Sequence, residues 1–551
     1  MDVLFSRFEG DSPVLQTIGK WAYQISANRE LIKMYIHLIL AAVFPIYIGA
    51  HASLRRPPSA AIPKKKTKDE DGEEEEEIKI EGMTPSDAIM FPVLAGITLG
   101  GLYALIKWMD DPKLLNKILN VYFSVLGVFG VGKLAADCLH VYTTFVFPNV
   151  WSTATETYYI DQMLSQQVTG FVNKARVQVH RRFLEDKTNP FPGWLSGVQF
   201  SPAVNKFLWK LRSEFKSHMI FKAHFRGIFT VKSKVRLNDV FGFFIGVGVI
   251  ALYNMNDAKP WWLTNIMGFG FCYGTLQLMS PTTFWTGTLI LSSLFVYDIV
   301  MVFYTPLMIT VATSLEVPIK LVFPGPKRGS MLGLGDVVLP GIMMALALRF
   351  DLYLHYLRKQ RTTSKPTIPP RAIEPDTIVR AKYQDATGLW GERYWTRKAK
   401  QGEETAADGA RFPKTYFKAS LVGYVSALLV TLVVMNVFNH AQPALLYLVP
   451  GVLSALWGTA FARNEVALMW DYSEDGEWGL EPEEKGKGGE EEKGDGSKKI
   501  EKKSGDEVVV AHAGGKRVEK EKKKDDEYEH HVFMFSLESP RVDMGAQKAL
   551  F

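Results

Sequence analysis

The feature that most constrains this chain is the separation of its apolar and charged residues into different stretches. Apolar runs of about 20 residues, the length that crosses the hydrocarbon core of a bilayer, alternate with segments rich in Lys, Glu and Asp. A soluble globule instead mixes apolar and polar side chains at the period of a helix or strand. We therefore expect an all-α polytopic membrane protein.

Nine apolar runs are candidate transmembrane helices. They cover residues 34–54, 88–106, 118–147, 240–255, 261–280, 284–306, 333–350, 416–438 and 443–462. The predicted organisation is helices one to three in 34–150, four to seven in 237–356, and eight and nine in 416–462. The other segments are 1–33, an insertion at 151–236, a loop at 357–415 and a tail at 463–551.

The charges on the connecting segments predict the orientation. Residues 151–236 carry 14 Lys/Arg against five Asp/Glu, residues 357–415 carry 13 against seven, and further basic residues gather at 55–68. Because basic loops stay in the cytosol, these three segments and the C-terminal tail are expected to be cytosolic. Nine spans then place residues 1–33 on the lumenal side. The net charge of +6 is too small to indicate nucleic-acid binding.

The insertion and the tail differ in composition. Aromatic residues alternate with basic ones in 151–236, which predicts short amphipathic helices on the cytosolic membrane surface. A small packed soluble insertion is the alternative. The tail at 463–551 is rich in Glu, Lys and Gly and has little to bury, so it is predicted to be disordered.

Two acids inside apolar runs are the strongest functional signal. Asp298 lies in the sixth predicted span and Asp336 in the seventh, and neither span has a basic residue before Arg349. Facing each other, the two carboxyl groups would share water and a proton, as in the aspartic proteases. A proton or cation relay in a channel or transporter also uses intramembrane acids. The carboxyl groups alone leave both readings open.

The residues around the acids favour the protease. Gly333 and Gly335 precede Asp336 and permit non-helical backbone, which at membrane depth lines a water-filled cavity. Pro340-Gly341 is expected to loosen the helix again one turn later. The ninth span opens with Gln442-Pro443-Ala444-Leu445, where the small Ala444 allows another helix to pack closely.

Three motifs in order carry a family resemblance. They are Tyr297-Asp298, Gly333-Leu334-Gly335-Asp336 and Pro443-Ala444-Leu445. This set resembles the intramembrane aspartyl proteases, the family of signal peptide peptidases and presenilins. The flanks LRFD at 348–351 and HAQPALLYLVP at 440–450 look closer to the signal peptide peptidases, and the long 151–236 insertion looks like a fungal-type elaboration.

The resemblance implies an aspartic endopeptidase of the endoplasmic reticulum membrane that cleaves type II transmembrane helices, chiefly remnant signal peptides and also some tail anchors. Asp298 and Asp336 would activate water without a metal or an organic cofactor. Tyr297 and the glycine and proline motifs would shape the site. A non-catalytic quality-control scaffold is disfavoured, because a scaffold has no reason to keep both acids. The sequence leaves open a homo-oligomer and quality-control partners.

A segment next to the seventh span suggests how substrate binds. A transmembrane helix hides its peptide bonds in hydrogen bonds, so it must unwind before water attacks. The hypothesis is that a run rich in β-forming residues offers a strand edge to the unwound substrate. The run is Val317, Pro318, Ile319, Lys320, Leu321, Val322 and Phe323. An ordinary extended loop is the alternative.

Overall fold

The computed structural model forms two compact units, one of residues 1–215 with 238–478 and one of residues 216–237 with 479–551. The residues that it describes are 29–61, 81–109, 113–153, 156–169, 182–183, 187–225, 229–256, 259–315, 317–318, 320–324, 330–363, 377–397, 409, 411–438, 442–474 and 533–538.

Eight helices among the described residues are long and apolar enough to cross a membrane. They are α3 (Arg29–Ala52), α4 (Asp87–Trp108), α5 (Lys113–Val146), α7 (Leu237–Met255), α9 (Phe284–Phe303), α11 (Gly335–Lys359), α13 (Thr415–Phe438) and α14 (Leu445–Ala462). The fifth predicted span is α8 (Trp261–Leu278), which contains Asn265 and Gln277 and is less apolar. The polytopic helical fold is thus confirmed, whereas the count of nine spans stays a prediction.

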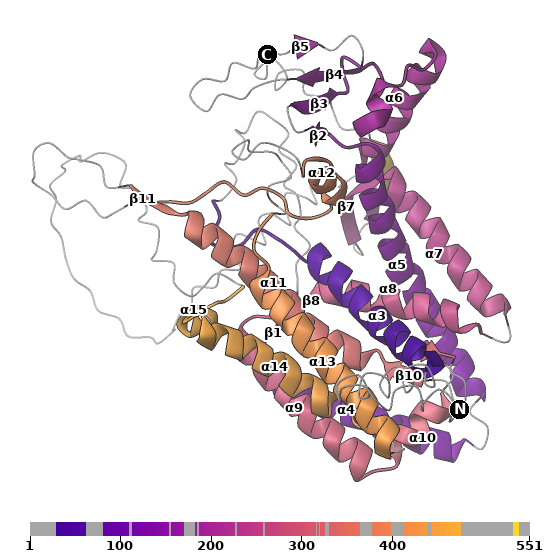
Figure 1. Ribbon diagram of the computed structural model, residues 1–551. Coiled ribbons are helices and arrows are strands. Elements are labelled where there is room, and N and C mark those ends of the chain that lie inside the picture. The colour runs from indigo at the N-terminus through magenta and orange to yellow at the C-terminus, as the bar shows by residue number, and fades with distance from the viewer. Residues whose placement is uncertain are drawn as a thin grey trace, which may run out of the picture. The chain divides into compact units, whose positions relative to one another are not determined.

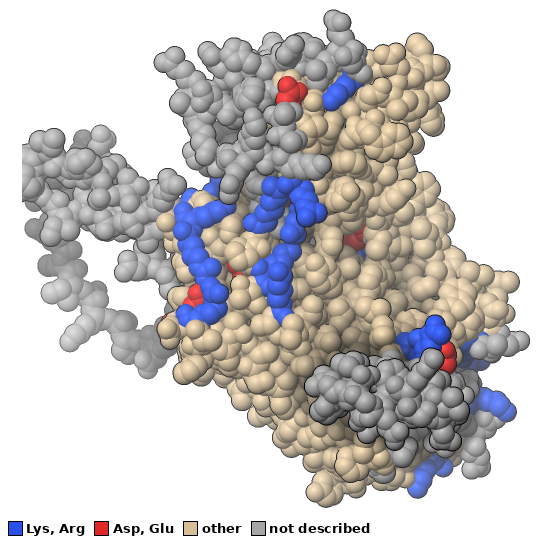
Figure 2. All heavy atoms as spheres, in the orientation of Figure 1, with Lys and Arg blue, Asp and Glu red and all other residues tan. Residues whose placement is uncertain are grey.

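Helix α11 forms the centre of the first unit. All of its residues from Pro340 to Leu352 are buried, and it packs against α3, α8, α9, α13 and α14 (Figure 1). The surface around the helices is largely uncharged on the face that Figure 2 shows, with Lys and Arg gathered toward the ends. This distribution suits helices that lie in a bilayer.

The predicted loosening at Pro340-Gly341 does not end the helix. Helix α11 runs through both residues to Lys359. Because proline has no N–H, the carbonyl of Asp336 lacks its helical donor. The hydroxyl of Tyr424 in α13 donates to that carbonyl at 3.3 Å. A neighbouring helix therefore supplies the hydrogen bond that Pro340 cannot make.

Short elements connect the helices of the first unit. The strands pair as β1 (Glu81–Met83) with β8 (Met279–Pro281), β9 (Lys320–Phe323) with β10 (Ser330–Gly333) and β11 (Arg361–Thr363) with β12 (Thr377–Val379). The short helices are α10 (Leu307–Ser314), α12 (Trp390–Trp395) and α15 (Val466–Trp470).

The insertion after α5 contains a packed sheet in addition to a helix of the predicted amphipathic kind. It contains an antiparallel sheet in the order β2 (Val150–Ser152), β3 (Thr157–Asp161), β4 (Gln166–Thr169) and β5 (Arg182–Phe183), followed by η1 (Gly193–Gly197) and α6 (Pro202–Lys216). Trp151 stacks on Tyr158 with ring centroids 4.2 Å apart. Ile160 and Trp209 complete this core. Trp151, Tyr158 and Trp209 therefore pack together, as the alternative of a packed insertion expected, whereas Trp194 and Phe207 are exposed.

The tail prediction is also wrong in two places. Residues 463–474 form α15 and a segment whose Met469, Tyr472 and Glu474 side chains are buried. Contacts with distant segments explain why residues 463–474 are structured, since the Tyr472 ring contacts Phe284 and Phe350. In the second unit, β13 (Phe533–Glu538) joins β6 (His218–Phe225) and β7 (Phe229–Arg236) in the order β13-β6-β7. The rest of the predicted disordered tail lies outside the described residues.

Candidate active site

Asp298 is buried in α9 and points at the start of another helix. Its side chain is 4% exposed, and its Oδ2 atom accepts the N–H of Leu445 at 3.1 Å. Leu445 is the first residue of α14, and the preceding Ala444 provides no side-chain cap. The first N–H groups of a helix have no partner within the helix and carry partial positive charge. Asp298 therefore caps α14 from outside.

This contact explains the residues at the start of the ninth predicted span. Pro443 is buried and half-buried Gln442 precedes it. A side-chain oxygen often accepts the first N–H groups of a helix, and neither Pro443 nor Ala444 has an acceptor atom in its side chain. The small residues leave room for the Asp298 carboxyl group. The expected close packing is therefore present, together with a specific hydrogen bond.

Asp336 lies at the start of α11, where β10 gives way to helix. Strand β10 ends at Gly333, Leu334 precedes the helix, and α11 begins at Gly335. The Gly333 N–H donates to the Asp336 carboxyl group. A Cβ atom added to Gly333 would lie only 3.3 Å from Asp336 Oδ2, whereas one added to Gly335 would meet nothing within 4 Å. A side chain at position 333 would therefore crowd the acid directly.

The two acids interact with each other and lack a cation. Asp298 is close enough to Asp336 for an electrostatic interaction. Among the residues that the structure describes, no ion pair includes either acid. Their hydrogen-bond donors are the backbone N–H groups of Leu445 and Gly333. Two adjacent carboxyl groups held in this way suit general acid–base chemistry on a water molecule.

Tyr297 takes a different direction from its neighbour Asp298. A Cβ atom added to Gly96 of α4 would lie 3.8 Å from the Tyr297 ring. Tyr297 therefore packs at the interface of α4 and α9, whereas Asp298 points to α14. Leu334 also packs away from the acids, because its side chain lies against Gly268 of α8. The structure thus brings only some of the predicted shaping residues next to the carboxyl groups.

The hypothetical substrate edge is partly a strand. Lys320–Phe323 form β9, which pairs antiparallel with β10 so that Val322 lies opposite Met331. Val317 is buried and Pro318 lies in a bend, and Ile319 lies outside the described residues. The outward edge of β9 is already occupied, since Asn265 accepts the Val322 N–H at 2.8 Å and donates to its carbonyl at 3.0 Å.

The register leaves the opposite edge of the hairpin available. Because Val322 points its backbone groups away from β10, Val322 and Met331 form a non-hydrogen-bonded pair. Met331 must then point its own N–H and C=O away from β9. Its side chain is 54% exposed, and its backbone has no partner among the described hydrogen bonds. The accessible edge is therefore β10 and not the predicted 317–323 segment.

Sequence reasoning missed two residues next to this site. Asn265 holds β9 and Tyr424 caps the Asp336 carbonyl. Asn265 could have been found, because it is an amide within an apolar run and so meets the criterion that identified Asp298. Tyr424 carries no such signal. Among the described residues, no group of three or more His, Cys, Asp and Glu side chains is arranged to hold a metal.

The chain is similar to known proteins over most of its length. A family model described as signal peptide peptidase matches residues 73–476. A signal peptide peptidase of Mus musculus is 29% identical over 448 residues, which cover 80% of this chain and 83% of the relative. A probable intramembrane protease of Saccharomyces cerevisiae is 23% identical over 501 residues, which cover 81% of this chain and 74% of the relative.

Proposed function

Because the chain belongs to the signal peptide peptidase family of intramembrane aspartyl proteases, we propose that Asp298 and Asp336 are its catalytic pair. The observation that carries this proposal is the pairing of two acids, neither in an ion pair, inside the helical bundle. Buried acids with only a structural role are normally paired with cations or saturated with donors. The described donors to these two are the N–H groups of Leu445 and Gly333.

The proposed chemistry is the addition of water to a peptide bond. One carboxylate takes a proton from water as the oxygen attacks the carbonyl carbon, and the other carboxyl group donates its proton to the carbonyl oxygen. Collapse of the tetrahedral intermediate breaks the C–N bond and returns a proton to the leaving amine. The Leu445 N–H fixes the position of Asp298 during both steps.

The unwound substrate is proposed to pair with β10. Met331 directs its backbone groups outward, two residues before the Gly333 N–H that binds Asp336. A substrate strand added there would bring its peptide bonds to the carboxyl groups through main-chain hydrogen bonds. Met331→Pro should impair cleavage, because it removes an outward donor and leaves the β9 bonds intact. Met331→Ala is the matched control, and equal cleavage by both variants would refute the pairing.

The substrates are proposed to be type II transmembrane helices, chiefly remnant signal peptides, in the endoplasmic reticulum membrane. The proposed orientation has a lumenal N-terminus and a cytosolic C-terminus, since the Lys/Arg-rich segments 151–236 and 357–415 then face the cytosol. A pair of model substrates with the same apolar segment in opposite orientations tests this assignment. Preferential cleavage of the type I orientation in sealed vesicles would contradict it.

Purified full-length protein in detergent tests the catalytic pair. A labelled type II signal peptide would be incubated with wild type, Asp298→Asn and Asp336→Asn. Cleavage by wild type alone is the expected result. Cleavage by either folded variant at the wild-type rate would overturn the assignment of that residue.

A further inference from the structure

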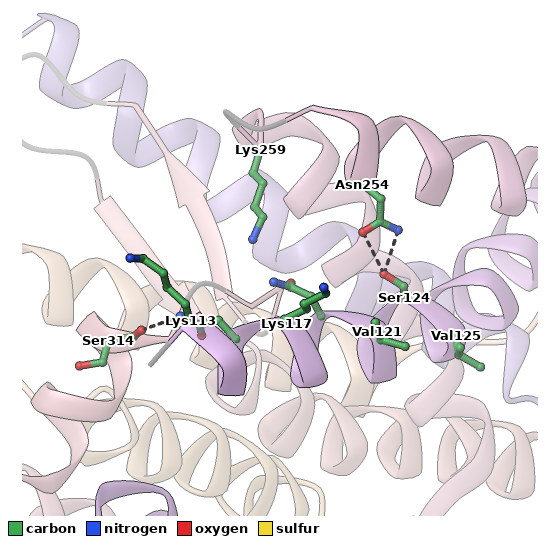
Figure 3. Close-up of a pocket in the computed structure, with 10 residues that line it drawn as sticks. Lys113, Lys117, Val121, Ser124, Val125, Asn254, Lys259 and Ser314 are labelled. Atoms are coloured by element: carbon green, nitrogen blue, oxygen red, sulfur yellow. Dashed lines mark hydrogen bonds between the residues drawn. The ribbon is translucent and has the colours of Figure 1, made fainter. Parts of the chain in front are cut away.

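A basic pocket lies at the start of α5, lined by residues that the proposed active site does not use. Its volume is about 800 Å³. Lys113, Lys117 and Lys259 are among the residues that line it, and Figure 3 shows Lys259 pointing toward α5. None of the described lining residues is acidic. The sequence neighbours Asp110, Asp111 and Asp257 lie outside the described residues.

Hydrogen bonds between helices fix the walls of the pocket. The Asn254 side chain of α7 donates to the Ser124 hydroxyl of α5 at 3.1 Å, and the Asn116 side chain donates to the Ser314 carbonyl of α10 at 3.2 Å. The Oδ1 atom of Asn120, another lining residue, is buried without a hydrogen-bond partner among the described residues. The pocket thus has a built wall and an acceptor that needs a donor.

One face of α5 changes from basic to apolar along the pocket. Lys113, Lys117, Val121 and Val125 are spaced four residues apart and so lie on the same face. Val121 is 61% exposed and Val125 is 56% exposed, although both line the pocket. At a rise of 1.5 Å per residue, Lys117 and Val125 are about 12 Å apart along the helix. A ligand along this face would have an anionic head and an apolar chain.

We propose that this pocket binds an anionic phospholipid, with its phosphate at Lys117 and an acyl chain along Val121 and Val125. Lys117 carries the proposal, since it is exposed and has no ion-pair partner among the described residues, whereas Lys113 and Lys259 have further interactions. The predicted third span begins at residue 118, so Lys117 lies at the depth of lipid headgroups, on the lumenal side in the proposed orientation. A headgroup hydroxyl would satisfy Asn120.

Native mass spectrometry of the purified full-length protein tests this site, with dioleoyl phosphatidylglycerol titrated into detergent solution. Lys117→Gln should weaken binding about fivefold, the contribution of one lysine to an anionic lipid surface. Lys107→Gln is the matched control, because Lys107 is an exposed lysine in the last turn of α4 outside the pocket. Phosphatidylcholine should bind wild type more weakly than phosphatidylglycerol. Equal binding by wild type and Lys117→Gln, or equal binding of the two lipids, would overturn the proposal.

Further binding experiments distinguish a lipid from a free phosphate or a peptide carboxylate as the anionic ligand. Val121→Trp should weaken phosphatidylglycerol binding by filling the path of the acyl chain, and unchanged binding would contradict a bound chain. Glycerol 3-phosphate, which has no chain, should fail to displace the lipid. A short apolar peptide with a free C-terminal carboxylate is the competing ligand. If it displaces the lipid at concentrations below the lipid Kd, the pocket binds peptide ends and the lipid proposal is refuted. Thermal melting of each variant checks its fold.

Discussion

Helix α11 carries one acid at its start and another in its C-terminal half, and the two acids have different surroundings. Asp336, at the start, has the Gly333 N–H and the neighbouring Asp298 as its described partners. Asp351, fifteen residues later, accepts the N–H groups of Tyr416 at 3.2 Å and Phe417 at 3.0 Å, which start α13. Beside it, Arg349 pairs with Glu474 and also donates to Ser53 and Ser280.

The difference separates an acid that suits chemistry from acids that hold the fold. At the Arg349 end, charges are buried with ion-pair or hydrogen-bond partners, which is the usual condition for stable burial. At the Asp336 end, a second acid takes the place of a cation, so burial costs free energy that other contacts must offset. We therefore expect substitutions around Arg349 and Asp351 to change the free energy of unfolding. Substitutions at Asp336 should instead change the cleavage rate.

The largest effect is expected for the catalytic pair. Asp336→Asn or Asp298→Asn should lower the cleavage rate by about 100- to 10,000-fold, since acid–base groups contribute 10²–10⁴ each. The melting temperature should stay at or above that of wild type, because an amide is cheaper to bury than a carboxylate without a cation. The rate and the melting curve of the same preparation measure both. A variant that melts far below wild type would mean that these acids also hold the fold.

A large loss of stability is expected from breaking the ion pair at the other end. Glu474→Ala leaves Arg349 buried without its partner and should cost about 3–5 kcal/mol of unfolding free energy. Arg349→Met together with Glu474→Leu should recover part of this loss, since it removes both charges. Thermal melts in detergent compare the three proteins. A wild-type melting temperature for Glu474→Ala would show that the pair contributes nothing.

A smaller loss is expected at the helix cap. Asp351→Ala leaves the N–H groups of Tyr416 and Phe417 without an acceptor and should cost about 1–3 kcal/mol. Asp351→Asn keeps one acceptor oxygen and should cost less. The remaining folded protein should cleave substrate at the normal rate per molecule. A fully folded Asp351→Asn variant without activity would contradict the division between the two ends.

The smallest effect concerns Lys414, which lies just before α13 beside His51. Burial, together with the nearby cations Arg393 and Lys418, lowers the pKa of Lys414 to about 8. Between pH 8 and the ordinary value near 10.5, the unfolded chain keeps a proton that the folded protein has released. The free energy of unfolding should therefore rise with pH in this window. Lys414→Met should lack this rise when melting temperatures are compared at pH 8 and 9.5.

The sequence predicts the reactive end of α11 better than the structural end. Asp298 and Asp336 are recognisable within their own apolar runs, because a lone acid is unusual there whatever packs against it. Glu474 has no such signal, since its partner Arg349 is 125 residues away and its own segment resembles the charged tail. Only the packed fold brings the two together.

Strands in the insertion were missed for a related reason. The prediction for 151–236 rested on the mixture of aromatic and basic residues across the whole segment, and it did not single out Trp151 or Tyr158. Their stacking depends on the pairing of β2 with β3, which a composition argument does not register. The proposed substrate edge on β10 differs from the predicted segment 317–323, because Asn265, whose side chain hydrogen-bonds the outer edge of β9, comes from a separate helix.

The most direct test of the contrast is to measure cleavage and thermal melting on the same purified samples of Asp336→Asn and Asp351→Asn. Asp336→Asn should be inactive and melt at or above the wild-type temperature. Asp351→Asn should melt lower than wild type but cleave normally while folded. An unstable Asp336→Asn together with a stable, inactive Asp351→Asn would contradict the assignment of chemistry to one end of α11 and structure to the other.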